Sequence, residues 1–509
     1  MRPRLHQAAL TWLAEDPDPD TRAELEAILA KGDDKALDER FGSRLQFGTA
    51  GLRGELGAGP NRMNVVLVRR AAAGIARYLG PGRRVVIGYD ARHKSDVFAA
   101  DSAAVLAGAG IEALLLPRRL PTPVLAFAVR HLACDAGIMV TASHNPPRDN
   151  GYKVYLGDGA QIIPPADAEI SAAIDAVGSL GEIPLDHTYR VLDDTVVEAY
   201  LDAVCSVVTD GPRQLRIVYT PMHGVGGHLA LDAFRRAGFA DVHVVAQQAE
   251  PDPDFPTVAF PNPEEPGALD LALADGEQLG ADLVIANDPD ADRLALAVQG
   301  RRLTGDEVGC LLADHLLATR PASRPRLVTT SIVSSTLLGR IAGDYGAQYE
   351  RTLTGFKWIV RPALAHPDWE FVIGYEEALG YAVGGVIYDK DGISAALVAA
   401  ELAASLHAAG HTLLDRLREL DDRYGRYRTA QRSFRLGPDE QAAAMVRVRS
   451  IPGAQSSPPP ADVVVVETAA GRVVFRPSGT EPKLKLYAEV VDGDPQALLD
   501  EASRSAGLA

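Results

Sequence analysis

The chain has 509 residues, of which 47% are hydrophobic, and its formal net charge is −17 at pH 7. This length is too great for one hydrophobic core, so several domains are expected, and the acidic charge argues against nucleic acid and anionic membranes as partners. No apolar run is long enough to cross a membrane, and the first residues lack the pattern of a secretion signal. Cys134, Cys205 and Cys310 lie in apolar surroundings typical of small buried hydrophobes, and a cytoplasmic location is expected.

In chain order, the apolar spacing first predicts a helical lead-in over residues 1–40. Strands and helices then alternate, a pattern that predicts parallel α/β layers. The predicted segments are a strand at 84–89, a helix at about 96–106 and a strand at 112–116. The same strand–helix pattern restarts with strands at 215–219 and 325–329. The tail differs, with a hairpin predicted at 463–466 and 472–475, a strand at 484–488 and a surface loop at 455–460. The fold class is therefore α/β, with three similar mixed α/β domains and a smaller C-terminal α+β domain.

Ser143 lies in a turn that follows a short apolar run, residues 137–140, which predicts a buried strand. The two prolines after the turn prevent a continuing strand, so we expect the Ser143 hydroxyl to be presented on a sharp, exposed turn. A hydroxyl beside His144 and close to a metal can accept and donate a phosphoryl group, and Lys153 can serve as charge partner or proton carrier. The alternative is a turn whose side chains only satisfy backbone groups.

Three carboxylates at alternate positions, Asp288, Asp290 and Asp292, follow the apolar run at 283–286, which predicts a buried strand. They would repel one another without a cation between them, and oxygen ligands of this kind suit Mg²⁺. A calcium-binding EF-hand loop is excluded, because its sixth position is Arg293 instead of Gly and its twelfth is Gln299 instead of Glu. The alternative is an acidic surface turn.

A third motif follows residues 473–475 near the C-terminus. Arg476 offers a planar fork for phosphate oxygens, and the turn after it combines hydroxyl donors with a glycine that permits close approach. Its spacing does not match a Walker loop, so nucleotide binding is not indicated. An ordinary hairpin turn is the alternative. The candidate phosphate ligands are Arg476, Ser478, Gly479, Thr480 and Lys483.

The order of these motifs resembles that of the α-D-phosphohexomutase superfamily, over nearly the whole chain. The motifs are Phe-Gly-Thr-Ala-Gly-Leu-Arg-Gly at 47–54, Thr-Ala-Ser-His-Asn-Pro at 141–146, Asp-Pro-Asp-Ala-Asp-Arg at 288–293, Glu-Glu-Ala-Leu-Gly at 376–380 and Arg-Pro-Ser-Gly-Thr-Glu-Pro-Lys at 476–483. Met-His-Gly-Val-Gly at 222–226 and Tyr-Asp-Lys-Asp-Gly at 388–392 resemble the branch of phosphoglucomutase-2-type and phosphopentomutase-type enzymes.

The resemblance implies a mutase that moves a phosphoryl group between the 1- and 6-positions of a hexose phosphate, as phosphoglucomutases and phosphomannomutases do. Ser143 would carry the phosphate, and one Mg²⁺ would be held by Asp288, Asp290, Asp292 and a seryl phosphate oxygen. A sugar 1,6-bisphosphate would form as intermediate and activator. It would then turn around without escaping, so that its other phosphate faces Ser143.

The resemblance also assigns binding roles. The loop that begins at Arg476 would hold the phosphate that does not react. The segment Glu376-Glu377-Ala378, which we call the sugar loop, would accept the sugar ring in both orientations, and Glu376 would accept hydrogen bonds from two sugar hydroxyls. The alternative for Glu376 and Glu377 is a solvated acidic pair. Ala378 stands where many hexomutases carry Ser. Lys357 would reach the sugar or its phosphate.

Four more residues are expected near the transferred phosphate. Arg53 would lie close to the phosphoserine, and Arg293 would steady the phosphoryl oxygens beside the metal. Spacing alone does not choose between His144 and Lys153 for handling the proton.

Four domains are expected to place one motif each on a central active-site cleft. They are an N-terminal α/β domain with the helical lead-in and the serine loop (1–195), a metal-binding α/β domain (196–302), a sugar-recognition α/β domain (303–425) and a C-terminal α+β phosphate-binding domain (426–509).

Other functions stay open at this point. Within the mutase class they are a phosphopentomutase that acts on ribose or deoxyribose phosphate, and a hexose-bisphosphate synthase. Outside that class they are a metal-dependent phosphatase and a non-catalytic sugar-phosphate sensor. The expected partner is a small-molecule sugar phosphate, with no nucleic acid and no membrane, and the chain is expected to be a monomer or a weak homo-oligomer.

Overall fold

A computed structural model describes residues 2–48, 51–457, 462–478 and 483–508. The chain forms two compact units. The first comprises Met1–Leu303 together with Leu379–Ala408, and the second comprises Thr304–Ala378 together with Ala409–Ala509. Two predicted phosphate ligands, Gly479 and Thr480, lie outside the described residues.

The first unit begins with three helices: α1 (Arg2–Glu15), α2 (Pro19–Lys31) and α3 (Asp34–Phe41). The start of α2 is fixed by Asp18, whose side chain accepts from a backbone N–H in the first turn, and its end by Gly32 in the left-handed conformation. Trp12, Leu25 and Leu37 bury the inner faces of the three helices together. The predicted helical lead-in is therefore confirmed.

A six-stranded mixed sheet follows, with strand order β1-β5-β4-β2-β3-β6. Its strands are β1 (Leu52–Glu55), β2 (Arg84–Tyr89), β3 (Glu112–Leu115), β4 (Ala136–Val140), β5 (Asp149–Leu156) and β6 (Arg190–Val191). The predicted parallel pairing holds for β2, β3, β4 and β6, but β5 runs antiparallel to both β1 and β4. The connection from β4 to β5 is too short for a crossover, so the two strands pair as antiparallel neighbours.

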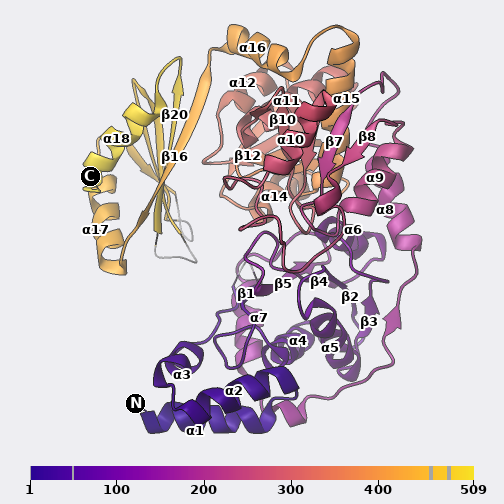
Figure 1. The fold of residues 1–509 in the computed structure, drawn as a ribbon. Helices are drawn as coiled ribbons and strands as arrows, with labels where there is room; N and C mark the ends of the chain where they lie inside the picture. Colours follow the sequence, from indigo (N-terminus) through magenta and orange to yellow (C-terminus); the bar gives the residue numbers. More distant parts are fainter. Residues whose placement is uncertain (1, 49–50, 458–461, 479–482, 509) are drawn as a thin grey trace. The chain divides into compact units, whose positions relative to one another are not determined.

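Helices cover both faces of this sheet, with α4 and α5 on one face and α6 on the other (Figure 1). The helices of this domain are α4 (Val65–Leu79), α5 (Ser95–Gly108), α6 (Thr122–His131), α7 (Ala166–Asp175), the short 3₁₀ helix η1 (Leu180–Glu182) and α8 (Thr195–Cys205).

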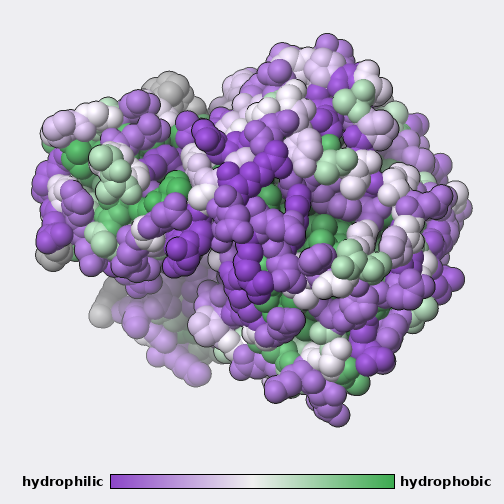
Figure 2. Space-filling model, turned by 90° about the horizontal axis from the view of Figure 1, so that it is seen from above, coloured by the Kyte–Doolittle hydropathy of each residue, from purple (hydrophilic) through white to green (hydrophobic). Residues whose placement is uncertain are grey.

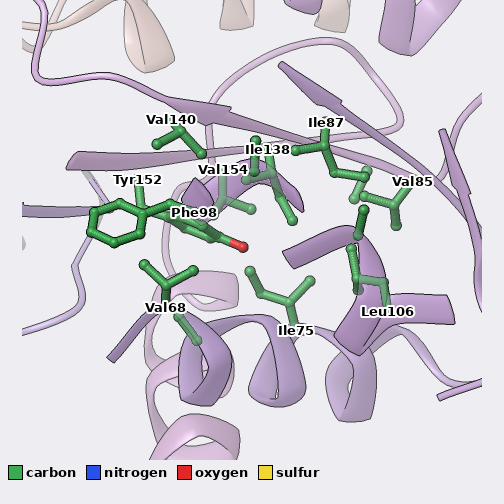
Figure 3. Packing of buried hydrophobic residues seen from close by; sticks show 14 of the residues in the cluster. Val68, Ile75, Val85, Ile87, Phe98, Leu106, Ile138, Val140, Tyr152 and Val154 are labelled. Carbon is green, nitrogen blue, oxygen red and sulfur yellow. The ribbon is translucent and has the colours of Figure 1, made fainter. Parts of the chain in front are cut away.

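The main core of the domain lies between the sheet and the helices α4 and α5 (Figure 3). Alternate strand residues point to the same face, so each strand contributes every second side chain. The strand residues are Val85 and Ile87, Ile138 and Val140, and Tyr152 and Val154; the helix residues facing them are Val68, Ile75, Phe98 and Leu106. This packing fixes the ends of β2, β4 and β5.

The second domain of the first unit has a five-stranded sheet with order β11-β10-β9-β7-β8. Its strands are β7 (Ile217–Thr220), β8 (Val242–Val244), β9 (Leu283–Ala286), β10 (Ala295–Val298) and β11 (Arg301–Arg302). Strands β7, β8 and β9 are parallel, whereas β10 is antiparallel to β9 and β11. The first unit also contains α9 (Gly227–Arg236), the 3₁₀ helix η2 (Ala246–Gln248), α10 (Asp270–Leu279), β15 (Gly380–Val383) and α15 (Gly392–Ala408).

The second unit contains a third α/β domain in which β12 pairs in parallel with β13 on one side and with β14 on the other. The strands are β12 (Arg326–Ser331), β13 (Gln348–Thr352) and β14 (Glu370–Glu376); the helices are α11 (Gly305–Thr319), α12 (Leu337–Asp344), α13 (Phe356–Ile359), α14 (Arg361–Ala365) and α16 (Leu413–Tyr424).

The C-terminal domain is an antiparallel sheet with order β16-β20-β19-β18-β17. Its elements are β16 (Tyr427–Arg435), α17 (Pro438–Arg449), β17 (Ala454–Ser456), β18 (Val464–Thr468), β19 (Gly471–Pro477), β20 (Lys483–Val491) and α18 (Pro495–Ser505). The predicted hairpin is β18 and β19, and the predicted strand is part of β20. The predicted loop at 455–460 is wrong at its start, because Gln455 and Ser456 pair with β18. Three α/β domains and a C-terminal α+β domain confirm the fold class.

Hydrophilic side chains dominate the face seen in Figure 2, with hydrophobic ones only in small patches. Among the described residues no single helix is long and apolar enough to cross a membrane, although α15 and α16 pass that test as a bent pair. The three cysteines are free thiols; Cys134 and Cys310 are buried as predicted, and Cys205 is partly exposed.

Candidate active site

Ser143 lies in the connection between β4 and β5. Its φ of 53° is in the left-handed region, which is unfavourable for a residue with a Cβ and is concentrated at functional sites. The turn is fixed because the Ser143 N–H donates to Thr141 Oγ1 at 2.8 Å. The Ser143 side chain is buried, so the exposure expected from the sequence is wrong.

Arg92, which follows β2, clamps this turn from inside the domain. Its guanidinium donates to the carbonyl oxygens of Pro146 at 2.7 Å, Ser143 at 2.6 Å and Asn145 at 2.5 Å. The Arg92 side chain is buried beside Asp90, which accepts from the Arg92 N–H at 3.0 Å. One buried cation thus holds several carbonyls of the turn, and this residue was not singled out from the sequence.

The three aspartates lie in the connection between β9 and β10, residues 287–294, which we call the metal loop. All three side chains are buried, and one oxygen from each lies within 4.8 Å of the others. Within the described part of the chain, Oδ1 of Asp290 and Oδ1 of Asp292 have no hydrogen-bond partner. Buried carboxylate oxygens without a partner are costly unless a cation coordinates them, so Asp288, Asp290 and Asp292 fit a hard divalent ion.

The metal loop is supported from two sides by glycines. A Cβ on Gly224 would lie 2.4 Å from Pro289 Cα, and a Cβ on Gly392 would lie 2.2 Å from the Arg293 carbonyl oxygen. Both distances are too short for any side chain, so the close backbone contacts require glycine. The motifs at 222–226 and 388–392 therefore contact the metal loop.

Two lysines neutralise the aspartates. Lys153 Nζ lies 2.7 Å from Asp290 Oδ2 and 3.0 Å from Asp292 Oδ2, and Lys390 Nζ lies 3.3 Å from the same Asp292 oxygen. Burial opposes ionisation of Asp290, but the Lys153 ammonium overcomes it and lowers the pKa of Asp290. Lys153 is itself buried, and its contacts are those of a charge partner.

The Ser143 hydroxyl faces the metal loop directly. Its Oγ donates to Asp288 Oδ2 at 2.9 Å and lies 3.1 Å from His144 Nδ1. Burial, followed by the charges of Arg293 and Arg53, holds the pKa of His144 well below its usual range, so the imidazole is neutral. Burial and the adjacent carboxylates raise the pKa of Asp288 well above its ordinary value. The serine is thus placed between a neutral imidazole and the carboxyl group of Asp288.

The two arginines expected near this centre lie in the same unit. Arg53 is on β1, opposite Gly151 of β5, and its charge acts on His144 and Lys153. Arg293 ends the aspartate motif; its N–H donates to Asp288 Oδ1 at 2.9 Å and its guanidinium lies 3.3 Å from Glu264.

The second unit holds the sugar-loop candidates Glu376, Glu377 and Ala378, at the end of β14. Glu377 Oε2 accepts from Ser331 Oγ at 3.0 Å and from Ser334 Oγ at 3.1 Å. Burial and the adjacent Glu376 charge raise the pKa of Glu377 to about 7. The sequence offered only an acidic pair here, without showing that its second member is fixed by hydroxyls.

Among the described residues, the phosphate-loop candidates Arg476, Ser478 and Lys483 lie at the end of β19, just after it and at the start of β20. The Ser478 N–H donates to the Lys483 carbonyl at 2.8 Å, which closes the base of the loop. Burial and then the charge of Glu377 raise the pKa of the Tyr487 hydroxyl, and the charge of Arg476 opposes this shift. The sugar-binding and phosphate-binding candidates Glu376 and Arg476 therefore both lie near Tyr487.

Lys357, the remaining candidate, lies in α13, where its carbonyl accepts from Arg361 Nε at 3.0 Å. Three residues were missed as site components: Arg92, Lys390 and Tyr487. A signal existed for Lys390, which stands inside a motif already singled out. Arg92 and Tyr487 are recognised only from their contacts.

Four family models for phosphoglucomutase/phosphomannomutase match the chain in succession. Those of the alpha/beta/alpha domains I, II and III match residues 44–180, 198–301 and 304–424, and that of the C-terminal domain matches residues 435–504.

Individual relatives agree with these matches. The chain is 45% identical to a "Probable phosphomannomutase" of Haemophilus influenzae, over 85% of this chain and 94% of that one. It is 36% identical to a "Probable phosphoribomutase" of Schizosaccharomyces pombe, over 96% and 94% of the two chains. The crystal structure of a "putative phosphomannomutase from Thermus Thermophilus" has a TM-score of 0.72 and 27% identity, over 91% and 98% of the chains. The chain therefore belongs to the phosphoglucomutase/phosphomannomutase family of the α-D-phosphohexomutase superfamily and is an isomerase of the phosphomutase type.

Proposed function

We propose that the protein moves a phosphoryl group between the 1- and 6-positions of a hexose phosphate, through a phosphoserine at Ser143 and a sugar bisphosphate intermediate. The observation that supports this most directly is the buried contact between Ser143 Oγ and Asp288 Oδ2 at 2.9 Å. It joins a nucleophile to a carboxylate cluster that has two oxygens left for a cation.

Asp288, Asp290 and Asp292 would hold one Mg²⁺ together with an oxygen of the phosphorylated Ser143. The ion, when bound, neutralises charge on the phosphoryl oxygens during transfer. Arg53 and Arg293 supply further positive charge to the same small region. This local concentration of cations offsets the acidic balance of the whole chain, which would otherwise repel an anionic substrate.

In the first transfer, the bond from Ser143 Oγ to phosphorus breaks and a bond from a sugar hydroxyl oxygen to phosphorus forms. The proton of that hydroxyl ends on Ser143 Oγ. His144 is neutral and lies 3.1 Å from Oγ, so we assign to it the role of carrying this proton. Lys153 is held by two carboxylates and acts as a charge partner.

The bisphosphate must then turn around, and this requires a second grip on it. Arg476, Ser478, Gly479, Thr480 and Lys483 would hold the phosphate that does not react, and Lys357 would reach the sugar or its phosphate. Glu376 would bind sugar hydroxyls in both orientations, with Ala378 leaving room beside it. The charges of Glu376 and Arg476 both act on the Tyr487 hydroxyl, which supports one continuous site for ring and phosphate.

A pentose phosphate is the second candidate substrate, because the relative in Schizosaccharomyces pombe that matches 96% of this chain is named as a phosphoribomutase. Ribose 1-phosphate and ribose 5-phosphate would react by the same transfer. A cytoplasmic location and a monomer or weak homo-oligomer stay predictions.

The test is a substrate panel with Mg²⁺ and a trace of sugar bisphosphate, in which isomer formation and inorganic phosphate release are followed together. Ser143→Ala is expected to abolish isomerisation and to prevent phosphorylation of the protein, detected by intact mass. Ser206→Ala, at an exposed serine on the first unit, is the control and should retain both. Isomerisation by the Ser143→Ala variant would refute the phosphoserine. Phosphate release without isomer would support a phosphatase instead, and binding without either would support a sensor.

A further inference from the structure

The segment Ser331–Thr336, which joins β12 to α12, contacts two elements that the proposed function assigns to the substrate. We call it the docking turn. On one side it holds the sugar loop: Ser331 Oγ and Ser334 Oγ both donate to Glu377 Oε2, and the Glu377 N–H donates back to Ser334 Oγ at 3.1 Å. The backbone and the side chain of Glu377 are thus both fixed by the docking turn.

On its other side the docking turn binds the C-terminal sheet through Arg472 of β19. The Arg472 guanidinium donates to the Ile332 carbonyl at 2.8 Å and to the Ser334 carbonyl at 2.6 Å. Each NH₂ group of the guanidinium makes one of these bonds, and Glu489 Oε2 lies 3.3 Å from the Arg472 guanidinium. Only 7% of Arg472 is exposed, so this cation is committed to the docking turn and is not available to a substrate phosphate.

Glu489 of β20, directly opposite Arg472 in the sheet, completes the contact. Its Oε1 accepts from Ser335 Oγ at 2.6 Å and from the Thr336 N–H at 2.7 Å, and its Oε2 accepts from Thr336 Oγ1 at 2.8 Å. A carboxylate and a guanidinium therefore hold the docking turn with bonds to five of its polar groups. Such charge-assisted bonds in a buried setting fix geometry more strictly than apolar packing does.

The same face of the sheet carries the phosphate-binding arginine. Residues at alternate positions share a face, so Arg472, Val474 and Arg476 of β19 lie together. Val474 and Tyr487 pack against Val333 of the docking turn. Val474 pairs with Tyr487 across the sheet, and the Arg476 charge acts on the Tyr487 hydroxyl. The docking turn, which holds Glu377, therefore also contacts the part of β19 and β20 that lies next to Arg476.

We infer that the docking turn is a positioning element that sets the phosphate-binding strand relative to the sugar loop, with Ser334, Arg472 and Glu489 as its positioning residues. This inference rests on the proposed function, because its purpose is to keep both ends of a sugar bisphosphate gripped at once. A bisphosphate held at one end only would leave before the second transfer. Loosening the docking turn should therefore increase escape of the intermediate and leave the chemistry at Ser143 unchanged.

The test compares Arg472→Met with Arg428→Met, an exposed arginine on β16 of the same sheet. Arg472→Met is expected to raise KM for the sugar phosphate and the release of free bisphosphate per turnover at least tenfold each. The rate at which the phosphorylated enzyme transfers its phosphate to the first sugar hydroxyl, measured in a single turnover, should stay within twofold of wild type. Arg472→Lys should restore part of the retention, because a lysine can keep one carbonyl contact.

Ser334→Ala is the second variant, chosen because it leaves the C-terminal sheet and Arg472 intact while removing one hydroxyl from Glu377. It should also increase bisphosphate release. If Arg472→Met and Ser334→Ala are folded but release no more bisphosphate than Arg428→Met, the inference is overturned. The inference would also be overturned if the rate of the first transfer fell by as much as the release of bisphosphate rose, because that pattern indicates general disruption of the enzyme.

Hydrogen exchange separates this inference from the proposed function. Amide exchange at residues 373–378, which cover the end of β14 and the sugar loop, should increase in Arg472→Met and not in Arg428→Met, whatever the substrate. If the wild-type protein isomerises no sugar phosphate, the proposed function fails. The exchange result still decides whether the Arg472 contact holds the sugar loop in place. Unchanged exchange in the sugar loop refutes the coupling even in an active enzyme.

Discussion

Lys153→Met removes the ammonium that bridges two buried carboxylates and keeps the aliphatic length of the side chain. Lys153 Nζ contacts Asp290 at 2.7 Å and Asp292 at 3.0 Å, and all three side chains are buried. Removing one partner of a buried ion pair costs about 3–5 kcal/mol, because the remaining charge is left uncompensated. The lower end applies here, since Lys390 stays 3.3 Å from Asp292.

A loss of about 3 kcal/mol corresponds to a fall of about 6 °C in the melting temperature of the unit, at the roughly 2 °C per kcal/mol typical of large domains. Magnesium should reverse much of this loss, because a cation that binds only the folded state at 100 times its Kd stabilises by about 2.7 kcal/mol. Without the competing ammonium, the magnesium-induced rise in melting temperature should be larger in Lys153→Met than in the wild-type protein.

The assay is thermal unfolding with a chelator and then with saturating Mg²⁺. Lys35→Met is the matched control: its side chain is 88% exposed and its ion pair with Glu39 is long, at 3.8 Å, so the change should be below about 1 kcal/mol. The buried ion pair would be refuted as a source of stability if Lys153→Met and Lys35→Met had the same melting temperature in chelator. An equal rise in both melting temperatures with Mg²⁺ would refute it too.

Three further predictions follow from other contacts. Gly305→Ala should lower kcat/KM by at least tenfold, because its Cβ would lie 2.0 Å from the Glu377 carbonyl oxygen; Gly343→Ala, with open space around the added methyl group, should leave kcat/KM unchanged. Glu377 has a pKa raised from 4.5 to about 7 in the folded state, so its neutral form stabilises the fold at low pH and this stability is lost as pH rises through about 7. Thermal unfolding of Glu377→Gln should therefore depend less on pH between 4.5 and about 7, and an unchanged slope would contradict the raised pKa. Asp290→Asn should abolish the magnesium-induced thermal shift and leave less than a hundredth of the activity, measured by calorimetric titration and the isomerase assay; an unaltered magnesium affinity would exclude Asp290 as a ligand.

The sequence by itself determined the strands that carry the site. The runs at 84–89, 137–140 and 283–286 are apolar because the strands are buried on both faces, and all three appear in the structure as β2, β4 and β9 within one residue of their predicted bounds. The chemistry of the motifs was also local information. Three alternate aspartates after a strand indicate a cation wherever the strand lies, and the structure brings all three together.

The direction of the strands beside those motifs was not available from the sequence. Alternating helices and strands favour parallel pairing, but β5 and β10 return antiparallel through the loops that carry Ser143 and the aspartates. Both loops are therefore short connections, and a short connection holds its side chains more rigidly than a long crossover would.

Only the tertiary structure decided which side chains meet. Ser143 and Asp288 are 145 residues apart in the chain, and Lys153 and Asp292 are 139 apart, so no local pattern encodes either contact. Burial of Ser143, the commitment of Lys153 to two carboxylates and the fixing of Glu377 by serines all depend on such distant pairs. Residue type and local periodicity are properties of neighbours in sequence, whereas the pKa of a group and the partner of a charge depend on what folding packs against it.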